Sequence, residues 1–161
     1  MNNNLSESAQ RVQEALKRHH IDIKVVEFKD TTRTAQEAAA TIGCHVGQIA
    51  KTLIFKGKKN GNPICIIASG QNRVDEKKVE QLIDEAIEKP NAEFVLQHTS
   101  FAIGGIPPIG YELEIKPLID QDLMQYQEIW AAAGTPFAVF RITPHELIKI
   151  SKAIISDIKK L

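Results

Sequence analysis

The sequence has few cysteines and no excess of charge of either sign. Its two cysteines, Cys44 and Cys65, lack the spacing of a metal site or a disulfide framework, so we expect reduced thiols and a cytoplasmic location. The 20 basic and 20 acidic residues cancel to a formal net charge of zero. This balance argues against binding of nucleic acid by bulk electrostatic attraction. The lysines between Lys51 and Lys78 form either a local basic stripe or an ordinary solvated surface.

Several patterns of known function are absent. The five histidines are not spaced as zinc ligands, and no Gly-x-Ser-x-Gly nucleophile motif occurs. There is no Walker-type phosphate loop, and the pair Gly104-Gly105 does not stand between a strand and a helix as in a dinucleotide-binding fold. The apolar runs are too short to span a bilayer, and the polar N-terminus does not resemble a signal peptide. We therefore expect no metal, no cofactor and no membrane contact.

The remaining patterns fit one mixed α/β domain over residues 1–161. Hydrophobic residues make up 43% of the 161 positions, which is enough for a sizeable core. Helical and strand patterns alternate irregularly, and this predicts an α+β arrangement with a mixed, mostly antiparallel sheet. Helices are expected at 6–20, 34–42, 74–84, 91–99 and 143–150, and short turns at 46–49 and 120–126. Strands are expected at 23–28, 50–55, 63–69, 86–89, 114–118, 128–133 and 137–142, with a strand or a turn at 153–158.

A glycine- and proline-rich stretch, Phe101-Ala-Ile-Gly-Gly-Ile-Pro-Pro-Ile-Gly110, interrupts these elements. Glycine opens backbone angles closed to other residues, and proline fixes its own, so the stretch predicts a rigid, shaped loop. Such a loop can bring backbone N–H groups close to a ligand. A tight connection under the core fits these ten residues about equally well.

Lys51 is the most informative charged residue. Side chains alternate along a strand, so Ile49, Lys51, Leu53 and Phe55 share one face of the strand expected at 50–55. That face carries the larger apolar groups and is expected to face the core. Lys51 then either points inward at the mouth of a pocket or reaches outward to solvent at the strand end.

Three segments together resemble a known family. They are Ile49-Ala-Lys-Thr-Leu-Ile-Phe55, the Phe101–Gly110 stretch, and Trp130-Ala-Ala-Ala-Gly-Thr-Pro-Phe-Ala-Val-Phe140 followed by Thr143-Pro-His-Glu-Leu147. In this order and spacing they resemble the YbaK/prolyl-tRNA-synthetase-associated domain family of aminoacyl-tRNA deacylases. The resemblance covers the chain from about Thr34 to about Ser151.

The resemblance implies a barrel-like mixed sheet surrounded by helices. It also implies trans-editing, the hydrolysis of the ester that joins a small, wrongly attached amino acid to the 3′ end of tRNA. The family uses no side-chain nucleophile, and its essential strand lysine is similar to Lys51. The loop that shapes the amino-acid pocket is similar to Gly104, Gly105, Ile106, Pro107 and Pro108, and a second loop lining the site is similar to Gly134, Thr135 and Pro136.

Some positions depart from the family pattern and leave the amino acid open. Lys51 is followed by Thr52 where the alanine-removing branch has asparagine, and Tyr111 follows the glycine-proline loop where many members have histidine. We expect Ile106 and Ile109 to set the size of the pocket. The expected partner is the aminoacylated 3′ end of tRNA, held by a local patch or delivered by a synthetase or an elongation factor. The alternatives are a non-catalytic module that binds tRNA or a synthetase, and a hydrolase of small aminoacyl esters.

Overall fold

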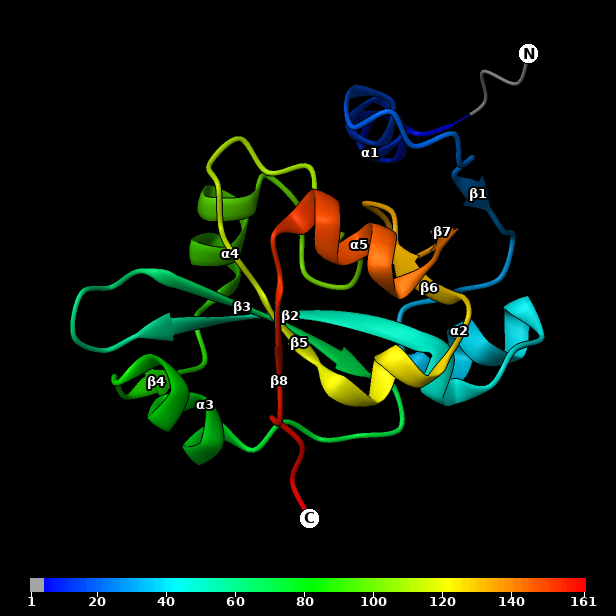
Figure 1. Cartoon of the computed structure of the whole chain (residues 1–161). Coiled ribbons are helices and arrows are strands. Elements are labelled where there is room, and N and C mark those ends of the chain that lie inside the picture. Colours follow the sequence, from blue (N-terminus) through cyan, green and yellow to red (C-terminus); the bar gives the residue numbers. More distant parts are fainter. Residues whose placement is uncertain (1–4) are drawn as a thin grey trace.

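A mixed sheet forms the centre of the computed structural model, which describes residues 5–161 (Figure 1). Within these residues the sheet has eight strands, in the order β1-β7-β6-β2-β3-β5-β8, with β4 paired to β2. Pairs β1–β7, β2–β3, β2–β4 and β6–β7 are antiparallel, and β2–β6, β3–β5 and β5–β8 are parallel. The strands are β1 (Val26–Glu27), β2 (Ile49–Gly57), β3 (Pro63–Ser69), β4 (Ile87–Glu88), β5 (Leu118–Asp120), β6 (Ile129–Ala132), β7 (Ala138–Ile142) and β8 (Ile154–Ser156).

Five α-helices of the described chain surround this sheet (Figure 1). They are α1 (Glu7–Arg18), α2 (Ala35–Ile42), α3 (Glu76–Ile83), α4 (Ala92–Thr99) and α5 (Pro144–Ser151). Two short 3₁₀ turns, η1 (Val46–Gln48) and η2 (Gln121–Gln125), precede β2 and follow β5. The predicted mixed α/β class, with helices around a mixed sheet, is confirmed.

Local capping signals place several helix ends correctly. Thr34 accepts a hydrogen bond from the Glu37 N–H, and the Glu37 carboxylate accepts one from the Thr34 N–H, so α2 begins with a complete capping box. Thr143 and Glu146 form the same arrangement at α5. Gly43 ends α2 in the left-handed conformation, with φ of 85°.

Other boundaries differ from those expected. The strand expected at 114–118 is wrong, because β5 begins at Leu118, where pairing with both β3 and β8 starts. The first strand is confined to Val26–Glu27, the length over which it pairs with β7. The third helix begins at Glu76, because the Asp75 carboxylate accepts hydrogen bonds from the first turn as an N-cap. The segment near the C-terminus forms a strand, β8.

Both faces of β2 are covered. Ala50 and Ile54 belong to the largest apolar cluster, which includes residues of α1, α5 and β7. On the other face, Ile49 and Phe55 are also buried, each in a smaller cluster. The expectation that the face with Lys51 is the main core face is therefore wrong, because the larger core covers the opposite face. Lys51 itself is exposed, on the face of β2 opposite the main core.

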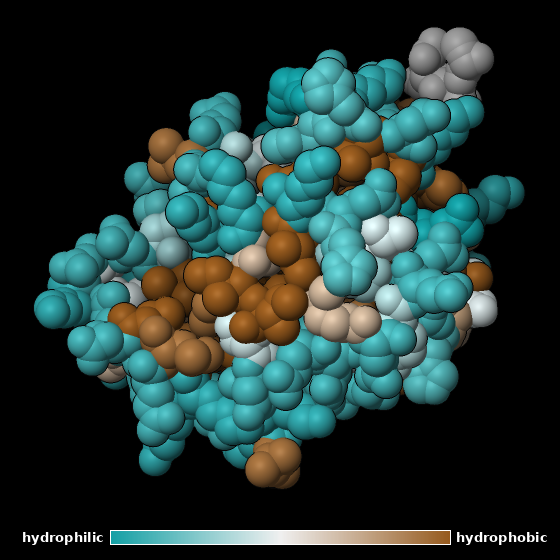
Figure 2. All heavy atoms as spheres, viewed as in Figure 1, coloured by the Kyte–Doolittle hydropathy of each residue, from teal (hydrophilic) through white to brown (hydrophobic). Residues whose placement is uncertain are grey.

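The edge strand β8 leaves apolar side chains uncovered. Ile154 is 57% exposed and Ile155 is 51% exposed. Figure 2 shows hydrophobic surface gathered near the middle of the view, over the region of β8 and the β2–β3 hairpin in Figure 1. Among the described residues, no helix combines the length and the apolar character needed to cross a membrane.

Candidate active site

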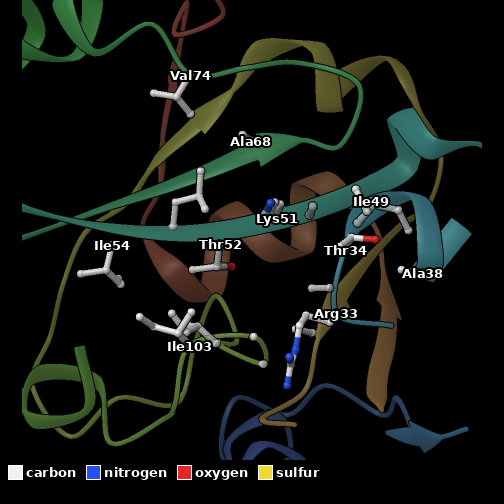
Figure 3. A pocket seen from close by; sticks show the side chains of 18 of the residues that line it. Arg33, Thr34, Ala38, Ile49, Lys51, Thr52, Ile54, Ala68, Val74 and Ile103 are labelled. Atoms are coloured by element: carbon white, nitrogen blue, oxygen red, sulfur yellow. The ribbon is translucent and has the colours of Figure 1, made fainter. Parts of the chain in front are cut away.

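A cavity of about 830 Å³ lies beside β2, where this strand separates from β6. Its walls come from the segment before α2, from β2, from the glycine-proline loop and from β6. Figure 3 shows Lys51 and Thr52 on β2, with Thr52 directed toward Ile103 of the loop. A volume of this size suits a small ligand, since binding pockets typically measure about 300–1,000 Å³.

The cavity borders an unpaired edge of β2. β6 pairs with β2 only at Ile49 and Ala50, and β4 pairs with it only at Lys56 and Gly57. Between these contacts, no strand in residues 5–161 pairs with this edge. The main-chain groups of alternate residues point to opposite edges of a strand. The Ile49 C=O and the Gly57 N–H point toward β3, so the N–H and C=O groups of Thr52 point to the open edge.

Lys51 extends from the exposed part of β2 and contributes to the cavity lining. Its ammonium makes no hydrogen bond or ion pair with another side chain or carbonyl in the described chain. A lysine in this condition keeps its three N–H donors available for a ligand. The structure thus places the predicted catalytic lysine at the cavity.

The glycine-proline loop forms the wall opposite β2. Gly104, Gly105 and Ile106 line the cavity, as Lys51 does. A Cβ atom on Gly105 would lie 2.6 Å from main-chain atoms of Thr135, so only glycine fits here. Gly104 has φ of 102°, which side chains rarely tolerate.

The second predicted loop, the β6–β7 turn, supports this wall from behind. The Gly134 N–H donates to the Gly105 carbonyl over 2.8 Å. Thr32 donates both its backbone N–H and its hydroxyl to the Pro136 carbonyl, over 2.6 Å and 2.9 Å. These bonds hold together the turn, the loop and the segment that carries Arg33. Gly134 and Thr135 do not themselves line the cavity.

Further contacts anchor the loop at both ends. The Arg11 guanidinium donates to the Ser100 carbonyl over 2.7 Å and lies 4.3 Å from the centre of the Phe101 ring. The Tyr111 hydroxyl donates to the Pro107 carbonyl, and Pro107 is buried. These contacts make the loop a preformed surface.

The prolines and one isoleucine of the loop lie behind its surface. Pro107, Pro108 and Ile109 are buried, and none of them lines the cavity. Ile109 belongs to the main core, whereas Ile106 reaches both the core and the cavity. The roles of these four residues in ligand binding remain predictions.

Cations outnumber anions around the cavity. Among its lining residues, the cations are Lys51, Arg33, Arg73, Lys89 and Lys160, and the one carboxylate is Glu76. All five cations are exposed, and none forms an ion pair within residues 5–161. The neutral chain therefore has a local basic rim at this cavity, which the overall composition does not indicate.

The cavity lining contains no activated nucleophile. No cysteine or histidine of the described chain lines it. Burial raises the pKa of the Cys65 thiol to about 12, and burial also raises the pKa of Cys44, so neither thiol readily forms a thiolate. No cluster of three or more His, Cys, Asp or Glu residues in the described chain could hold a metal ion.

Sequence reasoning missed several residues of the cavity. Arg33 lies against Gly104, where an added Cβ would be 3.0 Å from the Arg33 Nε atom. Ile103 lines the cavity and is 56% exposed. Thr52, which the sequence marks only as a departure from the family pattern, also lines the cavity and is 8% exposed. The position of Ile103 beside the glycine pair Gly104-Gly105 was an available signal, whereas the sequence around Arg33 gave none.

Comparison with known proteins identifies the family. The model of the family "Aminoacyl-tRNA editing domain" matches residues 29–150, which is most of the chain. This chain belongs to the aminoacyl-tRNA editing domain family. The resemblance inferred from the three sequence segments is thereby confirmed.

The editing domain has relatives that match it over most of its length. It is 32% identical over 127 residues to "Uncharacterized protein YwhH" of Bacillus subtilis, covering 79% of this chain and 80% of that protein. It is 23% identical over 146 residues to "Putative Cys-tRNA(Pro)/Cys-tRNA(Cys) deacylase EbsC" of Enterococcus faecalis, covering 89% of this chain and 88% of that protein. A solved structure, "Crystal structure of a putative trans-editing enzyme for prolyl tRNA synthetase", is similar with a TM-score of 0.93 and 43% identity, covering 98% of this chain and 100% of the other. The YbaK-like fold of the editing domain is thus shown.

Proposed function

We propose that this editing domain is a trans-acting aminoacyl-tRNA deacylase that removes a small amino acid from mischarged tRNA. The observation that carries the proposal is the placement of Lys51 in one cavity with Gly104, Gly105 and Ile106. The family supports the same conclusion, and so do the names of two relatives, which mention deacylation or trans-editing.

The reaction requires stabilisation of negative charge. Water adds to the ester carbonyl carbon, and the carbonyl oxygen becomes an oxyanion. The bond to the ribose 3′ oxygen then breaks, that oxygen takes up a proton, and a free amino acid and an uncharged tRNA end result. In this proposal the Lys51 ammonium stabilises the oxyanion, and the loss of one such donor typically costs about 3 kcal/mol.

The basic rim supports a polyanionic substrate. Exposed cations at the cavity attract the phosphates of a tRNA 3′ end, even though the chain as a whole is neutral. The terminal aminoacyl-adenosine is then held in the cavity that Lys51 and the loop both line. Since the lining holds no activated nucleophile, water is the attacking group in this proposal.

Hydrolysis of a panel of mischarged tRNAs tests the function. We expect the unchanged protein to release at least one small amino acid well above the spontaneous rate. Lys51→Ala should lower that rate about 100-fold. Lys59→Ala, in the exposed turn between β2 and β3, is the matched control and should leave the rate unchanged.

Three results would count against this proposal. Equal rates for Lys51→Ala and the unchanged protein would remove Lys51 from the mechanism. Inactivity on the whole panel, together with measurable tRNA binding, would favour the non-catalytic module. Equal efficiency on a minimal aminoacyl ester without tRNA would favour a hydrolase of small esters.

A further inference from the structure

Thr52 carries a buried hydroxyl without a hydrogen-bond partner. The residue is 8% exposed, and its Oγ1 atom makes no hydrogen bond within residues 5–161. In folded proteins the large majority of buried side-chain polar atoms are paired, so an unpaired one needs an explanation. A group that is satisfied only when a ligand is bound is one such explanation.

The surroundings of this hydroxyl are apolar. On its face of β2, Thr52 stands between Ala50 and Ile54, which belong to the main core. Across the cavity, Thr52 is directed toward Ile103 (Figure 3), and Ile106 lines the same cavity. The hydroxyl is therefore a polar side-chain atom among hydrocarbon side chains, next to the main-chain groups at the open edge of β2.

We propose that the Thr52 hydroxyl is the polar contact of a subsite for the side chain of the aminoacyl group. This subsite selects a small side chain that carries a hydroxyl, as in serine, over one that lacks it, as in alanine. The inference rests on the proposed deacylase function and adds the class of amino acid to it. Thr52 acts here as a specificity-determining residue.

The position of Thr52 relative to Lys51 favours the side chain as its partner. The two side chains leave β2 on opposite faces, so a substrate whose ester carbonyl is at Lys51 presents a different group to Thr52. The substrate ammonium is a poor candidate, because its charge is costly to place among hydrocarbon groups. A neutral hydroxyl suits the subsite, since it can donate to or accept from Thr52.

The exposed side chain of Ile103 controls access. Ile103 is 56% exposed and belongs to the part of the loop that lines the cavity. Its displacement admits a small side chain to Thr52, while the main-chain wall at Gly105 stays fixed by its bond to Gly134. A small hydroxylated group is thus favoured by both the size and the polarity of the subsite.

The test compares Thr52→Val with Thr52→Ser on one tRNA charged with serine or with alanine. Valine keeps the shape of threonine and removes the hydroxyl, whereas serine keeps the hydroxyl. We expect Thr52→Val to lower kcat/KM for seryl-tRNA about 10- to 100-fold and to change the value for alanyl-tRNA less than about threefold. Thr52→Ser should keep the preference for serine. Thr52→Val should lower kcat/KM less for cysteinyl-tRNA than for seryl-tRNA, because a thiol is the weaker hydrogen-bonding group.

An unchanged ratio of kcat/KM for seryl-tRNA to kcat/KM for alanyl-tRNA in Thr52→Val would overturn the inference. A larger loss of kcat/KM for cysteinyl-tRNA than for seryl-tRNA would overturn the choice of a hydroxyl.

A second measurement separates this inference from the proposed function. Binding of the 3′-amide analogues of seryl- and alanyl-adenosine needs no catalysis. If the unchanged protein hydrolyses nothing, the deacylase proposal fails, and the effect of Thr52→Val on the ratio of the two affinities still decides the role of Thr52. The melting temperature of Thr52→Val should equal or exceed that of the unchanged protein, which excludes misfolding as the cause of any loss.

Discussion

Gly134 donates its backbone N–H to the carbonyl oxygen of Gly105 over 2.8 Å, and this bond joins the β6–β7 turn to the loop that forms a wall of the cavity. At the same place, the Gly105 Cα lies so close to Thr135 that a Cβ would meet main-chain atoms at 2.6 Å. Two loops that are 29 positions apart in sequence therefore behave as one wall. The contact leaves no room for adjustment by a flexible side chain.

Gly105→Ala should separate the two loops. We expect the free energy of unfolding to fall by about 1–3 kcal/mol, because an added methyl group in a packed contact forces the backbone to shift. Deacylation should fall along with it. Gly43→Ala is the control, since Gly43 has φ of 85° but no atom within 4 Å of the added Cβ. That variant should lower the free energy of unfolding, measured by urea denaturation, by about 1 kcal/mol and leave the rate of deacylation unchanged. Identical behaviour of the two variants would contradict the role given to the Gly105 contact.

Tyr111→Phe should destabilise the glycine-proline loop. The change removes the donor to the buried Pro107 carbonyl and the contact between the tyrosine oxygen and Cys65 Sγ at 3.8 Å. A buried acceptor left unpaired costs about 1–3 kcal/mol of unfolding free energy. Tyr126→Phe is the matched control, because the Tyr126 hydroxyl makes no hydrogen bond in the described chain, and it should change the unfolding free energy by less than about 0.5 kcal/mol. Equal effects in urea denaturation would show that the Tyr111 bond adds nothing.

Stability should fall as the pH rises above about 9, where a free thiol ionises. Burial raises the pKa of Cys65 to about 12 in the folded protein. Between these two pKa values the unfolded chain holds fewer protons than the folded one. The free energy of unfolding therefore falls by up to about 1.4 kcal/mol per pH unit. Denaturation at several pH values from about 8 to 9.5 measures this slope, because burial also raises the pKa of Tyr111 and this residue adds to the slope as an unfolded tyrosine ionises near pH 10. Cys65→Ala should flatten the slope, and Cys44→Ala should largely keep it; a slope that persists in Cys65→Ala would contradict the assignment.

Arg73→Gln should weaken tRNA binding in a salt-dependent way. If Arg73 contacts one phosphate, the slope of log affinity against log salt should fall by about one, without a change in amino-acid preference. Filter binding at several salt concentrations gives the slope. Arg18→Gln, at the exposed end of α1 and away from the cavity lining, should leave it unchanged. An equal decrease for both arginines would indicate non-specific attraction in place of a rim at the cavity.

Much of the fold could be predicted because its signals are local. The capping residues Thr34 and Thr143 act on neighbours within a few positions. The start of β5 at Leu118 depends on pairing with two strands that are distant in sequence, and the pattern of residues 114–118 contains no trace of that pairing.

The candidate site could be predicted in part for the same reason. Lys51 and the loop at Gly104 stand out through strand alternation and glycine-proline content, and a resemblance of motifs suggests their roles; none of these signals needs the three-dimensional structure. The face of β2 that holds the main core could not be read from alternation, because helices cover both faces. The sequence marks Thr52 only as a departure from the family pattern, and its unpaired hydroxyl could not be predicted, because a missing hydrogen-bond partner depends on all the surroundings of an atom.

The open edge of β2 gives the cavity a set of donors and acceptors that no substitution of a side chain can remove. Peptide groups are the same at every position, so these contacts persist while the residues around them change. Relatives with little sequence identity can therefore share one way of holding the common part of a substrate. Under the proposed function, replacement of one or two covering side chains, such as those at positions 52 and 103, changes the recognised amino acid and leaves this main-chain framework intact.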